Sequence, residues 1–300
     1  MSLRIGSALI EAPPLPSGDD CDVQAWRLPD GRVWAYAHHV DSDRWLQLPS
    51  VGSFLLGGAA DTITAFPEPG VPEEALCDAY RRIVLPIAFQ AHGGEVLHAS
   101  AVRAPAGVVA LCADSQGGKS TTAFALSRRG FRLWADDALG LEFTGGGVAA
   151  VMLPFVLRLR PASARHFFGT ERAADHMPAA EDDGAHQPPA PLAAVFFLER
   201  VGRGRSDSVP EATRVRQSDA FARALAQAGC FTLQDPRRKE LMMRHYLELS
   251  ASVPFFTLRV PAGFDQLGDA LDCIETTLKM LNLRGPCRSP ARALATDKSL

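Results

Sequence analysis

The sequence lacks any apolar run that approaches the roughly 18 residues of a membrane-spanning helix. Near its start, only residues 8–10 form a short apolar patch, which is too small for the hydrophobic region of a secretory signal peptide. Because neither feature is present, we expect no membrane partner and a cytoplasmic location.

The sequence also has no C-x-x-C pair. Its six cysteines are scattered, at Cys21, Cys77, Cys112, Cys230, Cys273 and Cys287. This pattern is typical of reduced thiols in a cytosolic protein and argues against a disulfide framework or a zinc site. The adjacent His38 and His39 have no further ligand at a suitable spacing, so they predict no metal centre.

The chain also lacks a large excess of charge of either sign. Its 31 Lys and Arg residues nearly balance its 34 Asp and Glu residues, which gives a net charge of −3. This balance gives no reason to expect nucleic acid as a partner. What the chain has is an ordinary globular composition, with 47% hydrophobic and 22% charged residues over 300 positions. That length allows one large or two modest domains with a substantial core.

The most informative stretch reads as a strand, a glycine-containing loop and a helix. Residues 108–112 (VVALC) are apolar and rich in β-branched side chains, as in a buried strand. The next residues, 113–122 (ADSQGGKSTT), lead into a helix-forming segment. Their spacing fits the phosphate-binding pattern G-x-x-x-x-G-K-[ST], with Ala113 in the place of the first glycine.

In such a loop, successive backbone N–H groups form a concave anion site, and the following helix adds the positive end of its dipole. Lys119 would reach the β- and γ-phosphates, and the Ser120 hydroxyl would ligate Mg²⁺. The alternative is a surface turn with a solvated lysine, against which the strand before and the helix after both argue. The candidate nucleotide-binding residues are Ala113, Asp114, Ser115, Gln116, Gly117, Gly118, Lys119, Ser120 and Thr121.

Two adjacent carboxylates, Asp136 and Asp137, follow a predicted short strand at residues 131–135. In a parallel α/β sheet, ligands bind beyond the carboxyl ends of the strands, so a strand next to the loop strand would deliver both acids to the phosphate site. One acid could hold Mg²⁺ while the other accepts the proton of an attacking hydroxyl. The alternative is a solvated Asp-Asp turn.

A further strand is predicted at residues 96–102 (VLHASAV), and it carries His98. Taken alone, this histidine reads as a satisfied core residue rather than a functional one. However, LHASAV, the loop with GKS and the segment GFRLWADD (residues 130–137) together resemble the kinase core of HPr kinase/phosphorylase. They resemble even more the compact HPr-kinase-related proteins encoded with some bacterial peptide-modification pathways.

This resemblance implies an α/β fold with a P-loop kinase core of the HPr kinase and phosphoenolpyruvate carboxykinase type, a mixed sheet with flanking helices. It implies an activity that uses ATP and Mg²⁺ to phosphorylate a serine hydroxyl. His98, Asp136 and Asp137 would be catalytic, and Ser120 and Asp136 would serve the metal. The second glycine-rich signature of the true HPr kinases is not visible, which puts both HPr as a substrate and the phosphorylase activity in question.

Outside this centre, residues 1–70 consist of short segments punctuated by Gly, Pro, Asp and Ser, and they predict a small antiparallel β unit packed on the core. Its predicted strands are 33–37, 45–48, 53–56 and 62–66. The core would occupy residues 71–282, beginning with a helix over 73–91 that Pro86 kinks or ends. Residues 283–300 predict a flexible basic tail.

Periodicity predicts the remaining elements of the core: a hairpin (139–143 and 148–152), strands at 155–160, 193–200 and 255–260, and helices at 217–228, 236–252 and 264–280. On the 155–160 strand, Arg158 and Arg160 would share a face, as a clamp for a nucleotide or acidic substrate or as a solvated surface. Residues 171–191 could form a lid over the substrate. Glu199 could add a polar group near the site.

The function that we expect is transfer of the γ-phosphoryl group of ATP to a serine hydroxyl of a peptide or protein. A small-metabolite kinase acting on free serine or a similar alcohol is one alternative. A nucleotide hydrolase, or a scaffold without a phosphate acceptor, is another. The sequence also leaves a homo-oligomer open.

Overall fold

The structure is a computed structural model that describes part of the chain. The described residues are 2–5, 12–16, 23–40, 43–57, 62–170, 187–201, 209–229, 236–261 and 263–283. Most of the expected lid (residues 171–186) and the expected tail (residues 284–300) lie outside them. Within the described part, no helix is both long and apolar enough to cross a membrane.

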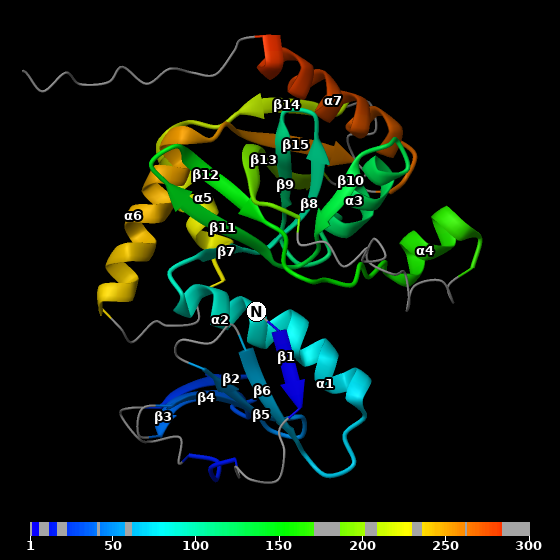
Figure 1. The fold of residues 1–300 in the computed structure, drawn as a ribbon. Helices are drawn as coiled ribbons and strands as arrows, with labels where there is room; N and C mark the ends of the chain where they lie inside the picture. The colour runs from blue at the N-terminus through cyan, green and yellow to red at the C-terminus, as the bar shows by residue number, and fades with distance from the viewer. Residues whose placement is uncertain are drawn as a thin grey trace, which may run out of the picture.

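The first sheet is built from residues 2–67 and lies at one end of the molecule (Figure 1). Its strands, in pairing order, are β1 (Ser2–Ile5), β6 (Thr62–Pro67), β5 (Gly52–Leu56), β4 (Asp43–Leu48), β3 (Val33–Val40) and β2 (Gln24–Arg27). Strands β3 to β6 confirm the four predicted strands, whereas β1 and β2 were not predicted. The sheet is largely antiparallel, but β1 pairs in parallel with β6, so the prediction of a wholly antiparallel unit was wrong at that edge.

A continuous helix over residues 73–91 confirms the predicted helix. It consists of α1 (Glu73–Ala79), a π-helical turn η1 (Tyr80–Val84) and α2 (Leu85–Ala91). Pro86 does not end this helix. Proline offers no N–H to the carbonyl of Arg82 and would clash with it in an α-helix, and a wider turn just before Pro86 avoids both problems. In Figure 1 the helix lies between the two sheets, with Leu76 and Val84 buried against the first.

The second sheet is mixed. Its main path is β10 (Arg132–Ala135), β8 (Ala99–Ala104), β9 (Gly107–Cys112), β13 (Ala190–Val201), β12 (Gly147–Val151), β11 (Leu139–Thr144) and β7 (Glu95–Leu97). Beside β13 also lie β15 (Phe255–Pro261) and then β14 (Glu211–Arg214), which was not predicted. Strands β9, β13 and β15 run parallel, and the other pairs are antiparallel. The predicted hairpin is confirmed as β11 and β12, and the strands predicted at 193–200 and 255–260 as β13 and β15.

Helices cover both faces of this sheet, around the doubly buried β13. Val195 and Phe197 join a hydrophobic cluster with α5 (Gln217–Ala226) and α6 (Pro236–Ser252). Phe196 and Leu198 join a second cluster with α3 (Lys119–Ser127) and α7 (Leu267–Leu283) on the opposite face. These helices confirm the predicted ones, and the fold is mixed α/β, as expected.

The position predicted for the strand before Asp136 was wrong in one respect. This strand, β10, does not lie next to the loop strand β9, because β8 lies between them. Both neighbours of β8 run antiparallel to it, so β10 and β9 point the same way. Their carboxyl ends therefore meet at one edge of the sheet, and the amino end of β8 lies at that edge as well.

The single strand predicted over residues 96–102 is in fact two strands that meet at His98. The first, β7, pairs with β11, and the second, β8, pairs with β9 and β10. His98 lies at the corner between them, where its backbone N–H donates to the carbonyl oxygen of Gln227 at 2.7 Å. Because the chain changes its pairing partners here, the His98 side chain stands free of the sheet interior.

The strand predicted at residues 155–160 was wrong. This segment has no strand pairing and leads into a helix that was not predicted, α4 (Pro161–Phe168). Instead of joining a sheet, the backbone N–H of Arg158 donates to Oδ2 of Asp136 at 3.2 Å. The leucines of the segment are buried and its arginines are exposed, which produces a strand-like alternation without a sheet.

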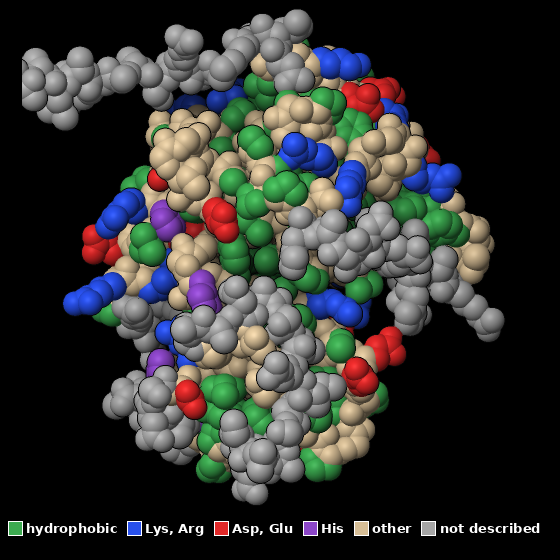
Figure 2. All heavy atoms as spheres, viewed as in Figure 1, with side chains coloured by type: hydrophobic (Ala, Val, Ile, Leu, Met, Phe, Trp, Pro, Cys, Tyr) green, Lys and Arg blue, Asp and Glu red, His purple; other side chains and the backbone are tan. Residues whose placement is uncertain are grey.

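Charges of both signs are spread over the surface. On the face shown in Figure 2, Lys and Arg side chains alternate with Asp and Glu side chains and do not gather into one large patch. The exposed large apolar side chains of the described residues are Leu15, Leu28, Val209, Met243, Leu247 and Met280. Single exposed apolar residues of this kind are normal on a protein surface.

Candidate active site

The predicted glycine loop connects β9 to α3 and needs both of its glycines. Gly118 has a φ of +96°, a conformation that glycine adopts without strain. A Cβ on Gly118 would overlap the guanidinium of Arg200, and a Cβ on Gly117 would overlap the Cβ of Ala113. The loop runs directly into the amino end of α3, where the unpaired N–H groups and the positive end of the helix dipole lie.

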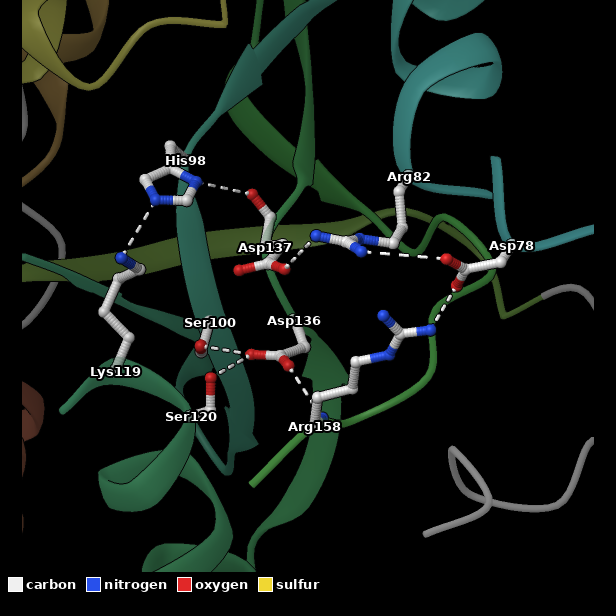
Figure 3. A network of polar contacts seen from close by, with 9 residues as sticks. All are labelled: Asp78, Arg82, His98, Ser100, Lys119, Ser120, Asp136, Asp137 and Arg158. Atoms are coloured by element: carbon white, nitrogen blue, oxygen red, sulfur yellow. Dashed lines mark hydrogen bonds and ion pairs between the residues drawn. The ribbon is translucent and has the colours of Figure 1, made fainter. Parts of the chain in front are cut away.

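Lys119, the first residue of α3, is almost fully buried. Its Nζ donates to the carbonyl oxygen of Ala113 and to Nε2 of His98, both at 3.0 Å (Figure 3). Burial lowers the pKa of Lys119 below its ordinary value, and the nearby carboxylate of Asp137 is the largest influence in the opposite direction. The two hydrogen bonds therefore position Nζ of Lys119 at the loop before any ligand binds.

The two contacts of His98 determine its tautomer. Because an ammonium group only donates, Nε2 of His98 accepts from Lys119. Its Nδ1 lies 3.1 Å from the carbonyl oxygen of Asp137, which only accepts, so Nδ1 carries the proton. His98 is exposed and lines the cavity beside the loop, unlike a satisfied core histidine.

Asp136 is buried, and both of its carboxylate oxygens are bonded. Oδ1 accepts from the hydroxyls of Ser100 at 2.6 Å and Ser120 at 2.8 Å, and Oδ2 accepts from the backbone N–H of Arg158 (Figure 3). Burial raises the pKa of Asp136 above its ordinary value, and the hydrogen bond from Ser100 is the strongest influence that lowers it. Asp136 thus joins β8, α3 and the segment before α4 at one point.

Asp137 has the opposite environment. Its side chain is 45% exposed, and Oδ2 lies 3.8 Å from Nη2 of Arg82. Its φ of +65° lies in the left-handed region, which aspartate tolerates better than most residues. In this conformation the two successive carboxylates diverge, so that Asp136 points toward Ser100 and Ser120 and Asp137 toward Arg82 (Figure 3).

A chain of charged side chains connects Asp137 to the helix over residues 73–91, and its members on the helix were not predicted. Asp78 on α1 lies between two arginines, with Oδ1 2.6 Å from Arg158 and Oδ2 3.7 Å from Arg82. Arg82 on η1 in turn faces Asp137 (Figure 3). In the sequence these residues read only as the polar face of an amphipathic helix, which carries no functional signal.

Arg200 at the end of β13 was also missed. Its Nε donates to the carbonyl oxygen of Gly117 at 3.2 Å, and Nη1 donates to the carbonyl oxygen of Pro261 at 3.1 Å. Glu199, the residue singled out in the sequence, faces the other way and pairs with Arg223 at 2.9 Å, away from the cavity. Successive strand residues face opposite sides, so only one of this pair reaches the loop.

These groups line one cavity of about 660 Å³. Its charged lining residues are Arg82, Lys119, Arg158, Arg160, Arg200, Asp136 and Asp137. The excess of positive charge suits a polyanionic ligand, and the volume lies within the roughly 300–1,000 Å³ of small-molecule sites. Residues 155–160 do not form the strand that was predicted to carry the arginine clamp, but Arg158 and Arg160 both line the cavity.

The donor set at Ser120 and Asp136 fits Mg²⁺. A hydroxyl and a carboxylate are hard oxygen ligands, and these two oxygens already lie 2.8 Å apart. Mg²⁺ in proteins is usually bound through one or two carboxylates, with water and phosphate oxygens completing its shell. The cavity beside them, of about 660 Å³, has room for such a shell.

Of the predicted site residues, the structure brings His98, Ser120, Asp136 and Asp137 to the cavity together with loop residues 115–119. Thr121 also lines the cavity, and its hydroxyl bonds that of Ser163 at 2.7 Å. Ala113 contributes its carbonyl oxygen to Lys119, whereas Asp114 is exposed and outside the lining. The structure shows where these residues lie, and their catalytic roles stay predictions.

Comparison with known proteins yields a distant structural likeness. No protein-family model matches the chain, and no curated protein matches it. Among solved structures, the chain is similar to the Hpr(Ser) kinase/phosphatase from Coxiella burnetii, with 14% sequence identity and a TM-score of 0.34. That match covers 63% of this chain and 94% of the other.

Proposed function

We propose that this protein is a Mg-ATP-dependent kinase with a P-loop core of the HPr kinase type. The γ-phosphoryl group would pass to a hydroxyl, with a serine of a peptide or protein as the acceptor. The observation that carries the proposal is the contrast between two adjacent acids. Asp136 is buried and bonded to Ser120 at 2.8 Å, whereas Asp137 is open to the same cavity.

The glycine loop and Lys119 would hold the β- and γ-phosphates. On binding, Lys119 would exchange its bonds to His98 and the Ala113 carbonyl for phosphate oxygens, which gain more from its charge. Arg200 lies against the loop and would meet the same phosphates. This region of the cavity supports a nucleotide because backbone donors, a helix end and cations converge there.

Ser120 and Asp136 would hold Mg²⁺ through their oxygen atoms. When bound, the metal would neutralise negative charge on the β- and γ-phosphates. Ser100 donates to Asp136 at 2.6 Å and keeps its carboxylate aligned with the Ser120 hydroxyl. Ser100 would therefore position the metal ligand without touching the metal.

Asp137 would accept the proton of the acceptor hydroxyl. In that step the acceptor oxygen bonds to the γ-phosphorus, the bond from this phosphorus to its bridging oxygen breaks, and ADP leaves with that electron pair. Arg82 beside the carboxylate and His98 bonded to the Asp137 carbonyl would orient the base. His98 would also line the space through which the phosphoryl group passes.

The direct test is turnover of γ-labelled Mg-ATP with serine-containing peptides, free serine or water as the acceptor. We expect label in a peptide, and no label with the Asp137→Asn variant. Label only in free serine would move the assignment to a small-metabolite kinase. Nucleotide binding with no turnover under any condition would contradict a kinase and favour a scaffold.

A nucleotide hydrolase is the second candidate, because the 45% exposure of the Asp137 side chain leaves it accessible to water. A base that reaches bulk water could activate water as readily as a hydroxyl. The same assay separates the two functions. Free phosphate released at an equal rate with and without peptides would support the hydrolase and contradict the kinase.

A further inference from the structure

A second cavity, of about 300 Å³, adjoins the nucleotide side of the site. The two cavities share three lining residues: Arg82, His98 and Asp137. These three side chains therefore form the boundary between a larger cationic cavity and a smaller one. Asp137 therefore lines both cavities.

The other walls of the smaller cavity carry no charge. They are formed by Ile83, Pro86, Val96, Ala138 and Gly229. The first two come from the helix over residues 73–91, which is wide at η1. The others come from β7, from the turn after Asp137 and from the segment that follows α5. Burying a charged group against these walls would cost its hydration, and the charged lining residues Arg82 and Asp137 already face each other, whereas an apolar group gains by entering.

Two of these walls, Val96 and Gly229, are held by hydrogen bonds that do not involve the boundary residues. The N–H of Gly229 donates to the carbonyl oxygen of Val96 at 2.8 Å, and the carbonyl oxygen of Gly229 accepts from Gln90. The hydroxyl of Tyr246, a fully buried residue of α6, donates to the same Val96 carbonyl at 2.9 Å. The cavity is therefore preformed, as small-molecule sites usually are.

We propose that this smaller cavity is the acceptor pocket, and that it takes an apolar side chain next to the hydroxyl that is phosphorylated. The inference rests on the proposed kinase function and narrows its substrate class to a serine flanked by an aliphatic residue. Asp137 at the boundary faces the hydroxyl, while the neighbouring side chain enters between Ile83, Pro86 and Ala138. The volume, at the lower end of the roughly 300–1,000 Å³ range, fits one side chain rather than a whole peptide.

The first arm of the test compares short peptides with one serine flanked by Leu, Gly, Asp or Lys. We expect kcat/KM with Mg-ATP to be about 10–100-fold higher for the Leu peptides than for the Gly peptides, and lowest for Asp and Lys. Calorimetric Kd values for the same peptides in the presence of Mg-ADP should follow the same order. Equal values for all flanking residues would overturn the inference.

The second arm applies one substitution on each side of the boundary. Ala138→Leu fills the acceptor pocket, and Ala162→Leu fills the larger cavity, which Ala162 lines. We expect Ala138→Leu to remove the preference for Leu peptides while nucleotide Kd stays unchanged, which also shows that the variant folds. We expect Ala162→Leu to weaken nucleotide binding and leave the peptide preference intact.

Ile83→Ala provides a further check, because it enlarges the acceptor pocket and should shift the preference toward Phe-flanked serines. If peptides are phosphorylated but Ala138→Leu and Ile83→Ala leave the order of acceptors unchanged, the acceptor pocket is wrong and the kinase stands. If Leu peptides bind better in the Kd assay but no acceptor is phosphorylated, the pocket stands as a binding site and the kinase fails. If neither binding preference nor transfer appears, both are overturned.

Discussion

Asp136 and Asp137 are neighbours in the chain, yet one is a buried acceptor of three hydrogen bonds and the other is a half-exposed carboxylate. The left-handed φ of Asp137 produces this difference, because it turns the second side chain away from the direction of the strand. Division of labour between two acids is a common way to place a metal ligand and a base at one site. At the residue scale, the proposed mechanism therefore requires Asp136 to bind Mg²⁺ and Asp137 to accept the proton.

The Asp137→Asn substitution tests that division. Asparagine tolerates the left-handed conformation and nearly matches aspartate in shape, but it cannot accept the proton as a base. We expect kcat for phosphoryl transfer to fall by about 10²–10⁴-fold while nucleotide Kd remains within a factor of about two. Asp219→Asn, on the exposed side of α5, serves as the matched control and should retain full activity. A loss of nucleotide binding with Asp137→Asn would contradict the assignment of a base.

We expect the Lys119→Met substitution to weaken nucleotide binding without lowering the stability of the protein. Removal of the charge should weaken Mg-ATP binding by about 10–150-fold, the usual value of a hydrogen bond to a charged group. Burial lowers the pKa of Lys119, so its charged form is less favourable in the folded protein without nucleotide than in the unfolded chain. We therefore expect the variant to be at least as stable as the wild type near neutral pH, measured by urea unfolding.

The difference in unfolding free energy between the wild type and Lys119→Met should change with pH in one direction. Between the lowered pKa of Lys119 in the folded protein and its ordinary value, the unfolded chain holds a proton that the folded protein has released. Stability of the wild type should therefore rise with pH across that window, relative to Lys119→Met. Unfolding measured from about pH 7 to about pH 10 checks this, and a widening advantage of the variant would contradict it.

At the scale of elements, the loop between β9 and α3 depends on what β13 brings beside it. Arg200 lies where a Cβ of Gly118 would be, and it bonds the Gly117 carbonyl. Because β13 runs parallel to β9, this contact joins two segments about 80 residues apart in the chain at one edge of the sheet. The shape of the loop is thus supported from outside the motif.

Gly118→Ala should disturb both the loop and Arg200. A non-glycine residue at a φ of +96° costs about 1–2 kcal/mol, and the added methyl group must displace the guanidinium. We expect unfolding free energy to fall by about that amount and nucleotide Kd to rise, as measured by denaturation and calorimetry. Gly145→Ala in the β11–β12 turn is the control, since its Cβ meets nothing and its φ is ordinary, so it should be near neutral.

At the scale of the whole molecule, the helix over residues 73–91 serves both sheets. One side packs Leu76, Tyr80 and Val84 into the core of the first sheet, while Arg82 reaches the cavity from the other side and is paired there with Asp78. The first sheet therefore supports residues of the site without contributing any lining residue of its own among those described. The boundary predicted at residue 70 stays a prediction, although the helix shares its hydrophobic cluster with the strands before that boundary.

A pair of large-to-small substitutions tests this arrangement. Phe54→Ala in the first sheet and Phe196→Ala in the second both remove fully buried rings and should each cost about 3–5 kcal/mol of unfolding free energy. Only Phe196 lies in the hydrophobic cluster that includes residues of α3. We therefore expect only Phe196→Ala to weaken nucleotide binding by the folded fraction of the protein. Equal loss of nucleotide affinity in both variants would show that the site depends on the first sheet directly.

By itself, the sequence determined the local part of this protein. The strand, loop and helix around Lys119, the Asp136–Asp137 pair and the long helices are specified by residues close together in the chain. Glycine conformation, apolar periodicity and capping act over a few residues, so their patterns can be read directly. The strand predicted at 155–160 failed because burial of alternate leucines mimics a sheet pattern without a partner strand.

Only the tertiary structure decided the order of the strands, the corner at His98 and the charges that line the cavity or pair with its lining residues. Asp78, Arg82 and Arg200 come from segments far from the loop, and nothing in their own neighbourhoods distinguishes them from solvated residues. Their position follows from how the helix over 73–91 packs between two sheets and how β13 pairs with β9. Packing and strand pairing depend on contacts between distant segments, which local patterns do not encode.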